Sequence, residues 1–381
     1  MREKVSFFKR PAVQTILASV LCAVIGILLG YVILLIMNAE HAGEGIAAIL
    51  INFFKFNNNS KVLMKYFGSF LVKSVPTILC GEAILFAYKA GLFNIGCAGQ
   101  YTVGIIASIY CSVGLGWNWF LCVIAAMVAG GIWGLIPGIL KAYRNVNEVI
   151  AGIMLNWIAL YVCNIVLGTE LCMDTTKSET HDIAKVNPAG ILPPFMKDFF
   201  GGNDYITIAV PITVIIAILI LVVLNKTTFG YELKATGHNK DAAKYAGMNA
   251  KRNIVLTLVI SGAIAGLAAA LLYLTGIEHY KISGSVPGTG FDGIAVAFLG
   301  GLHPIGTIFA GMLVKYITLG GSYLNTNYYN PQVADLVIAI IIYLCGFVLF
   351  FKTFINKRGK SKVKVNANAE PSQKTAEEKE V

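Results

Sequence analysis

Two carboxylates inside apolar segments are the side chains of this sequence with the most distinctive chemistry. Glu82 and Asp292 each lie next to helix-breaking residues, within runs that are otherwise apolar. Charged groups are expensive in a lipid bilayer, and those that occur there usually mark a path for ions or solutes. For three other candidates, a position near the membrane surface is the simpler interpretation: Glu148, Lys315 and Asp335. The two remaining carboxylates are therefore functional hypotheses.

The other reactive residue types give no catalytic or cofactor site. The five histidines have neither metal-ligand spacing nor a nucleophile as a partner, so a membrane hydrolase or transferase is poorly supported. Residues 288–293 fit the pattern G-x-G-x-x-G, but no strand precedes them and a membrane segment follows, which argues against dinucleotide binding. We predict no catalytic residue, no metal and no cofactor.

Composition indicates the class of protein that must position these residues. Hydrophobic residues make up 56% of the 381 residues and charged residues only 13%, whereas soluble domains are about one quarter charged. Apolar runs such as 11–37, 119–140 and 206–224 are each long enough to cross about 30 Å of hydrocarbon. The first run is too long for a cleaved signal peptide and is interpreted as a retained anchor. The sequence predicts an all-α polytopic membrane protein with one transmembrane domain over residues 11–351.

The distribution of charge predicts the orientation of the chain. The basic N-terminus (1–10), the basic loop 225–252 and the lysine-rich tail 352–381 belong in the cytoplasm by the positive-inside rule. The tail is poor in apolar residues and is predicted to be disordered. The acidic loop 168–205 suits the external side. Both termini are therefore predicted to be cytoplasmic.

Eight full transmembrane helices fit between these charged segments. A further stretch, 290–321, must leave and return on the same side, because a break at 300–304 leaves a first arm of about a dozen residues, near 18 Å, too short to span. This predicts a broken hairpin, or ten helices if both arms are counted. The eight spans are predicted at 11–37, 67–88, 96–113, 119–140, 149–167, 206–224, 254–276 and 333–351.

Another interruption, earlier in the chain, lies in the stretch 91–104, which reads GLFNIGCAGQYTVG and contains four glycines. Gly-rich breaks in a membrane bundle are typical of a transport path. The alternative is a glycine turn between ordinary helices, with Asn94 and Gln100 capping the ends. Together with the hairpin, the path is favoured. The candidates for lining it are Asn94, Gly96, Gln100, Asn156, Asp292 and His303.

The basic loop contains signals for a short, exposed helix. Asn239 can cap it, Asp241 suits its first turn, and Gly247 supplies a left-handed stop. Such a helix would present a rigid surface to a cytoplasmic partner, whereas the simpler alternative is a solvated basic loop. Elsewhere, glycines at four-residue spacing predict faces where helices pack closely: Gly130, Gly134 and Gly138 on one helix, and Gly262 and Gly266 on another.

Four blocks of the sequence resemble a known family. They are GLFNIGCAGQ (91–100), NEVIAGIMLNWIALY (147–161), ATGHNKDAAKYAGMN (235–249) and GTGFDGIAVAFLGGLHPIG (288–306). They are similar to permease subunits of bacterial ABC importers, in the family of branched-chain amino acid, ribose and nucleoside permeases, and the nucleoside branch is closest. The family often has N-I-G-x-E-G-Q in the first block, and Ala98 stands in place of that glutamate. A role of that carboxylate cannot be transferred to this chain.

The resemblance implies a non-enzymatic permease of nucleosides in a bacterial cell membrane. It implies as partners a second permease subunit, expected to be a different chain, an ABC ATPase and an external lipid-anchored binding protein, with no nucleic acid. The short helix would be the coupling helix that docks on the ATPase, through Asn239, Asp241, Ala242, Ala243, Tyr245, Ala246 and Gly247. Ribose or another simple sugar is the alternative substrate. An ion-coupled transporter using Glu82 and Asp292 is a weaker alternative, because it gives the capped loop no purpose.

Overall fold

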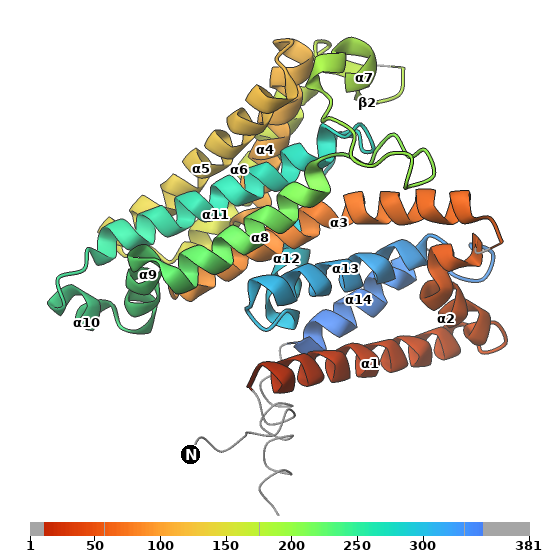
Figure 1. Ribbon diagram of the computed structural model, residues 1–381, viewed down its shortest axis with the longest axis horizontal. Coiled ribbons are helices and arrows are strands. Elements are labelled where there is room, and N and C mark those ends of the chain that lie inside the picture. The colour runs from red at the N-terminus through yellow and green to blue at the C-terminus, as the bar shows by residue number, and fades with distance from the viewer. Residues whose placement is uncertain (1–10, 57, 175, 331, 346–381) are drawn as a thin grey trace, which may run out of the picture.

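A computed structural model describes residues 11–345 except 57, 175 and 331 (Figure 1). The predictions for the basic N-terminus 1–10 and for the tail 352–381 lie outside the described residues. The described chain is almost entirely helical, and its strands are a single antiparallel pair of two residues each, β1 (Met173–Asp174) and β2 (Glu179–Thr180). The expected all-α membrane class is confirmed.

The helices follow the predicted apolar runs closely. Two of them, α2 and the short η2, lie in a stretch for which no span was predicted. The elements are α1 (Pro11–Met37), α2 (Ala42–Ile51), η2 (Asn52–Phe56), α3 (Ser60–Lys89), α4 (Cys97–Ile109), η3 (Tyr110–Gly114), α5 (Trp119–Arg144), α6 (Glu148–Leu167), α7 (Ile183–Val186), η4 (Pro188–Gly190), α8 (Ala209–Lys226), α9 (Thr228–His238), α10 (Lys240–Tyr245), α11 (Ala250–Tyr273), α12 (Thr289–Leu299), α13 (Pro304–Gly321) and α14 (Gln332–Cys345).

Six of the described helices are long and apolar enough to cross a membrane: α3, α5, α6, α8, α11 and α13. Five of these correspond to predicted full spans, and α13 is the second arm of the predicted hairpin. Among the other predicted spans, 96–113 is a shorter helix, α4, continued by the π-helical turn η3. The span predicted at 333–351 is described only as far as α14 extends. The structure therefore supports a multi-pass bundle, while the count of eight stays a prediction.

The predicted break at 300–304 is confirmed, whereas the return of the hairpin to the same side of the membrane stays a prediction. Helix α12 has 11 residues, and α13 begins at Pro304 after a turn in which Gly301 and Leu302 have φ values of +67° and +53°. Proline at the first position of a helix has no N–H to lose there, whereas it would disrupt a helix interior. The chain therefore ends one helix and starts another within the hairpin.

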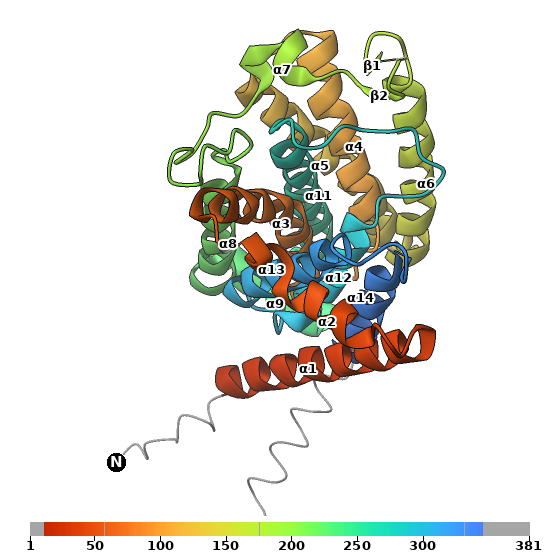
Figure 2. The same ribbon diagram turned by 90° about the vertical axis from the view of Figure 1, so that its right-hand side faces the viewer.

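Helices α3 and α11 form the centre of the bundle. The most apolar windows of these two helices are 89% and 72% buried, compared with about a third or less for α5, α6 and α8. Figures 1 and 2 show α3 and α11 running between the outer helices. Exposed apolar side chains cover the outer helices, as at Met154 and Ile165 of α6. This arrangement suits a bundle whose surface contacts lipid.

The predicted glycine faces join α5 to α11. A Cβ atom built on Gly130 would lie 2.3 Å from the carbonyl oxygen of Gly262, and one on Gly262 would meet the Gly130 oxygen at the same distance. A Cβ on Gly134 would lie 2.2 Å from the Leu258 oxygen. No side chain fits in these places, so the backbones touch directly. The interpretation of these glycines as close-packing residues is confirmed.

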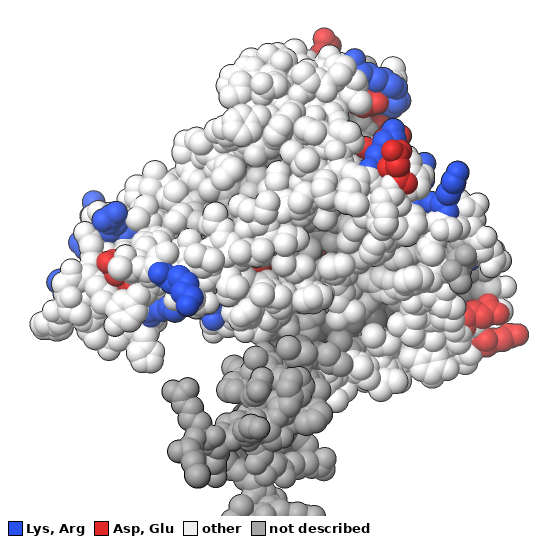
Figure 3. Space-filling model, viewed as in Figure 1, with Lys and Arg blue, Asp and Glu red and all other residues white. Residues whose placement is uncertain are grey.

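Charged side chains gather at the two ends of the bundle. Figure 3 shows mainly lysines and arginines, with a small acidic patch, at the end that carries α9 and α10, both signs of charge at the end that carries α7, and an almost uncharged band between them. The basic end includes Lys234, Lys240 and Lys244. An uncharged band between charged ends is the surface expected of a membrane bundle.

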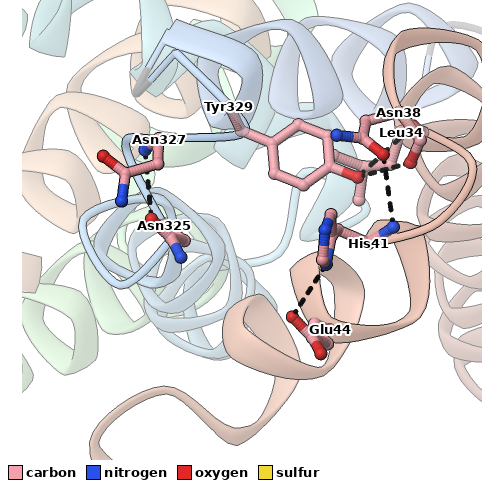
Figure 4. A network of polar contacts seen from close by, with 7 residues as sticks. All are labelled: Leu34, Asn38, His41, Glu44, Asn325, Asn327 and Tyr329. Carbon is pink, nitrogen blue, oxygen red and sulfur yellow. Dashed lines mark hydrogen bonds and ion pairs between the residues drawn. The ribbon is translucent and has the colours of Figure 1, made fainter.

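The first and last described helices pack against each other at the side of the bundle. The hydroxyl of Tyr329, which precedes α14, donates a hydrogen bond of 2.8 Å to the carbonyl of Asn38, which follows α1 (Figure 4). Beside it, the His41 ring stacks on Tyr328 with centroids 3.7 Å apart and lies 3.3 Å from the carboxylate of Glu44. The N-terminal helix is therefore fixed to the C-terminal part of the chain.

Candidate functional site

The first interruption, residues 90–96, runs back into the bundle before α4 begins. Gly91 packs on Gly237 near the end of α3, where an added Cβ would lie 2.9 Å from the Gly237 Cα. The thiol of Cys97, the first residue of α4, lies 4.0 Å from the carbonyl of Cys80. Nine residues separate Cys80 from the end of α3, so α4 starts about 13 Å inside that end. Non-helical backbone therefore lies within the bundle, buried in protein.

The amides of this interruption form one buried network. The Asn94 side-chain NH₂ donates to the Gln100 side-chain oxygen and to the Ser261 hydroxyl, both at 2.8 Å. Ser261 in turn donates to the backbone carbonyl of Ala83 at 2.7 Å. The network joins α3, α4 and α11 and satisfies groups that would be costly to bury alone.

Asn156 fixes α6 to the same region. Its side-chain oxygen accepts from the N–H of Gly99 at 2.7 Å, and its NH₂ donates to the carbonyl of Ile95 at 3.1 Å. Close beside it, a Cβ on Gly96 would lie 3.3 Å from the Cα of Gly152. The structure thus brings together four predicted residues, Asn94, Gly96, Gln100 and Asn156.

The three amide side chains of this cluster are at most 3% exposed. In this conformation Asn94, Gln100 and Asn156 hold helices together, so direct contact with a solute would require those helices to separate. Their role in lining a path stays a prediction. Asn94 and Gln100 also do more than cap a turn, because their partner Ser261 lies on a distant helix.

The other two predicted path residues lie on the hairpin. Asp292 is half-buried in the first turn of α12, and His303 is exposed at the start of α13. Two glycines of α12, which were considered above as part of a rejected nucleotide-binding pattern, bring this helix against the first interruption. A Cβ on Gly290 would lie 2.3 Å from the Cα of Ala98, and one on Gly293 would lie 2.8 Å from Cys80.

This packing bears on why Ala98 stands where the family often has glutamate. Ala98 is fully buried, and α12 packs on it through the backbone of Gly290. A glutamate at this position would have to displace neighbouring atoms. In this chain the interruption and the hairpin are instead in direct contact.

Glu82 is the buried ionisable residue of the central helix. Its side chain is fully buried, and neither carboxylate oxygen has a hydrogen-bond partner among the described residues. The adjacent Gly81 packs against Val296 of α12 and Thr307 of α13, where an added Cβ would approach within 2.8 Å. Within the described part of the chain, no three metal-binding side chains cluster. The carboxylate therefore has an unmet hydrogen-bonding capacity at the junction of the interruption and the hairpin.

The capped helix predicted in the basic loop is present as α10. The Asn239 side-chain oxygen accepts from the N–H groups of Asp241 (3.0 Å) and Ala242 (2.9 Å), and Gly247 has φ of +82°. Tyr245 is 95% exposed, whereas Ala243 is buried. The predicted cap and stop are confirmed. Ala243 belongs to the inner side of α10, so only the other predicted residues lie on its exposed surface.

A rigid connection joins this basic loop to the first interruption. Helix α9, which precedes α10, packs its Gly237 so closely on the α3 end that a Cβ would lie 2.5 Å from the Ala90 carbonyl carbon. The Asn253 side chain of α11 donates to the Thr236 hydroxyl of α9 at 3.1 Å. Helix α9 is therefore in direct contact with the residues that start the interruption.

The opposite end carries a small polar pocket of about 120 Å³ in the predicted external loop. Charges of both signs line it, including Asp174, Lys177, Glu179 and Lys185, with His279 from the segment after α11. Hydrogen bonds from the hydroxyl and N–H of Thr176 lower the pKa of Asp174 below its usual value, so this carboxylate is ionised at neutral pH. The pocket therefore presents charges of both signs at this end of the bundle.

Comparison with known proteins identifies the family. Residues 66–346 match the family model described as branched-chain amino acid transport system / permease component. This match covers both interruptions and the capped helix. The chain belongs to this permease family. It is a multi-pass membrane component of a transport system, as the resemblance implied.

The most informative relatives are permeases of nucleoside transporters. The chain is 38% identical to the guanosine ABC transporter permease protein NupP of Bacillus subtilis, over 73% of this chain and 80% of the relative. It is 32% identical to the nucleoside ABC transporter permease protein NupB of Lactococcus lactis, over 76% and 81%. The glucose ABC transporter permease protein TsgB13 of Haloferax volcanii is 29% identical, over 74% and 77%. No solved structure matches the chain.

Proposed function

We propose that the chain is the transmembrane permease subunit of an ATP-driven importer that moves nucleosides across the bacterial plasma membrane. Family membership supports the role of permease, and the two relatives with the higher identities are named for guanosine and nucleosides. The glucose permease among the relatives makes a simple sugar the second candidate substrate.

The observation that carries the ATP-driven mechanism is the connection from α10 to the first interruption. Helix α10 presents Tyr245 almost fully exposed, and α9 contacts the residues at the start of the interruption through Gly237. Exposed aromatic residues are frequent anchors in protein interfaces. Docking of an ABC ATPase on α10 would therefore move backbone that lies within the bundle.

Two further partners complete the proposed importer. In Bacillus subtilis, NupP and NupQ are both named guanosine ABC transporter permeases, and NupQ is 26% identical to this chain. This pair supports a different chain as the second permease of this system. The charged pocket between residues 168 and 205 suits an external, lipid-anchored binding protein. With this orientation the α10 end and both chain termini face the cytoplasm, in agreement with the basic loop 225–252.

The solute path would run beside the first interruption and the hairpin formed by α12 and α13. Asp292 and His303 lie on the hairpin at its surface, whereas Asn94, Gly96, Gln100 and Asn156 support the adjacent helices. Binding of solute within the membrane is expected to be weak in such an importer, because the external protein supplies the affinity.

Removal of the Tyr245 ring tests the proposed coupling. Tyr245→Ala is expected to weaken ATPase docking roughly tenfold or more, because interface tyrosines often contribute about 2 kcal/mol. ATP hydrolysis and uptake of labelled guanosine should be measured in vesicles that contain the complete transporter. Tyr231→Ala is the matched control, since Tyr231 is also exposed but lies on α9.

The outcomes separate the parts of the proposal. Loss of stimulated hydrolysis and of uptake in Tyr245→Ala, with normal values in the control, supports docking on α10. Normal coupling in both variants would contradict it. Uptake of glucose but not of guanosine by the unmodified transporter would replace the proposed substrate by the sugar.

A further inference from the structure

The segment between α11 and α12 enters the bundle as non-helical chain. Residues 281–288 have no regular structure, and most of them are exposed or half-buried. Figure 2 shows this part of the chain (teal) leaving α11, reaching α6 and turning to α12. Its last residue, Gly288, begins the G-x-G-x-x-G pattern for which dinucleotide binding was rejected.

Contacts with α6 give the depth that this segment reaches. The Asn164 side chain, near one end of α6, donates to the carbonyl of Ser283 at 2.8 Å. Seven residues later, Gly290 touches Ala98, whose neighbour Gly99 donates to Asn156. Asn164 and Asn156 are about 12 Å apart along the α6 axis. Since α6 is long enough to span a membrane, the segment descends to the level of its middle.

The backbone of this segment is poorly satisfied. The N–H of Ser285 bonds only to the Ser283 hydroxyl, at 3.1 Å. No described residue accepts a hydrogen bond from the N–H of Gly284, Val286 or Gly288. An unsatisfied amide exposed to hydrocarbon costs several kcal/mol, so irregular backbone at this depth must contact water or other protein. This surface therefore does not face lipid.

The residue types of the segment favour water over a protein partner. Ser283, Gly284, Ser285 and Gly288 are small and offer hydroxyl groups and bare amides. They lack the large aromatic anchors that fill the centre of a protein interface. A Cβ on Gly284 or on Gly288 would meet no atom within 4 Å, so open space adjoins the backbone.

We propose that residues 283–288 line the aqueous path at the membrane level of α6. The hydroxyl of Ser285 and the unbonded N–H groups would donate to oxygen atoms of a neutral, hydroxyl-bearing solute as it passes. Small side chains let the solute approach the backbone. The choice of solute rests on the proposed function, whereas the exposure of this segment to water does not.

Cysteine labelling tests this placement. Gly284→Cys and Ser285→Cys should be made in the complete transporter in vesicles and treated with a charged, membrane-impermeant methanethiosulfonate reagent. Ile218→Cys on α8 is the matched control, because Ile218 is half exposed on an apolar surface of the bundle. Both test positions tolerate the change, since one adjoins open space and the other is exposed.

Both segment variants should react at least about tenfold faster than the control, because the reactive thiolate is suppressed in apolar surroundings. Excess guanosine should slow their labelling. Absence of labelling in the complete transporter would overturn the proposal, and labelling only in the isolated chain would assign the segment to the interface with the second permease. Labelling that guanosine does not slow, together with absent guanosine uptake, would retain the path and reject the solute.

Discussion

Buried polar side chains divide into two groups at the junction of α3, α4 and α11. Asn94, Gln100 and Ser261 satisfy one another, whereas the carboxylate of Glu82 has no partner among the described residues. A satisfied network stabilises a unique arrangement of helices. An unsatisfied carboxylate opposes stability in this conformation, which is a reason to expect that another conformation or a bound solute supplies its partner.

Substitution of Asn94 tests the structural role of the network. Asn94→Leu is expected to lower the free energy of unfolding by about 1–3 kcal/mol, because it removes the NH₂ group that donates to the Gln100 side-chain oxygen and to the Ser261 hydroxyl. Thermal unfolding in detergent measures the change. Thr102→Val is a suitable control, since the Thr102 hydroxyl bonds only to the Ala98 carbonyl of its own helix.

A variant Asn94→Leu that is as stable as the unmodified chain but transports slowly would contradict this expectation. This outcome would instead support the role of lining the path, which was predicted for Asn94 from its position in a Gly-rich break. Equal losses of stability in both variants would show that any buried hydrogen bond in α4 matters to the same degree.

Local sequence predicted some residue roles and could not predict others. Asn239 and Gly247 act within a few residues of chain, so the cap and stop of α10 could be inferred. The partner of Asn94 lies 167 residues away on α11. The burial of Ala243 depends on how α10 packs after folding. Such long-range packing leaves no local signal.

Helix α5 and helix α11 approach each other as closely as their backbones permit. The contacts between Gly130 and Gly262, and between Gly134 and Leu258, leave no space for a side chain. In a membrane the hydrophobic effect does not drive helices together, so this close fit and its dispersion contacts hold the pair.

Substitution of one glycine on α5 tests this contact. Gly130→Val should separate the helices and lower the melting temperature strongly, with a loss of about 1–3 kcal/mol or more from overpacking. Gly131→Ala should have little effect, because the nearest atom to a Cβ there is 3.4 Å away. Thermal unfolding of both purified variants in detergent provides the comparison. Similar melting temperatures would show that the helices can move apart at little cost.

At the scale of elements, the lengths of apolar runs and the positions of helix-breaking residues carried much of the prediction. Apolar runs located the long helices, and Gly300–Pro304 located the hairpin break. The start of α4 deep in the bundle was not predicted, because it follows from the contact of Cys97 with Cys80 and not from local sequence. The descent of residues 281–288 was missed for the same reason, since neither their composition nor their length shows how far they enter the membrane.

Charge at the two ends of the bundle sets the expected orientation of the whole molecule. The uncharged band in Figure 3 separates the basic α9–α10 end from the mixed charges of the α7 end. The positive-inside rule places the basic end in the cytoplasm.

Accessibility from the two sides of the membrane tests this orientation. Lys177→Cys, at an exposed position of the 168–205 segment, should react with an impermeant thiol reagent on intact cells. Lys240→Cys on α10 should react only after lysis. The parent chain gives the background. Six of its cysteines are buried: Cys80, Cys97, Cys111, Cys122, Cys163 and Cys172. Labelling of position 240 on intact cells would reverse the orientation and remove α10 from the ATPase side.

The hydrogen bond from Tyr329 to Asn38 has a consequence for how the protein is made. The two residues are separated by 291 positions. At about 5–20 residues per second, a ribosome needs roughly 15–60 s to deliver the second after the first. During that interval α1 has already been synthesised, while the chain that contacts it is still being translated. A truncated product that ends before Tyr329 would leave α1 without this contact, and we expect cellular proteases to remove it sooner than the finished chain.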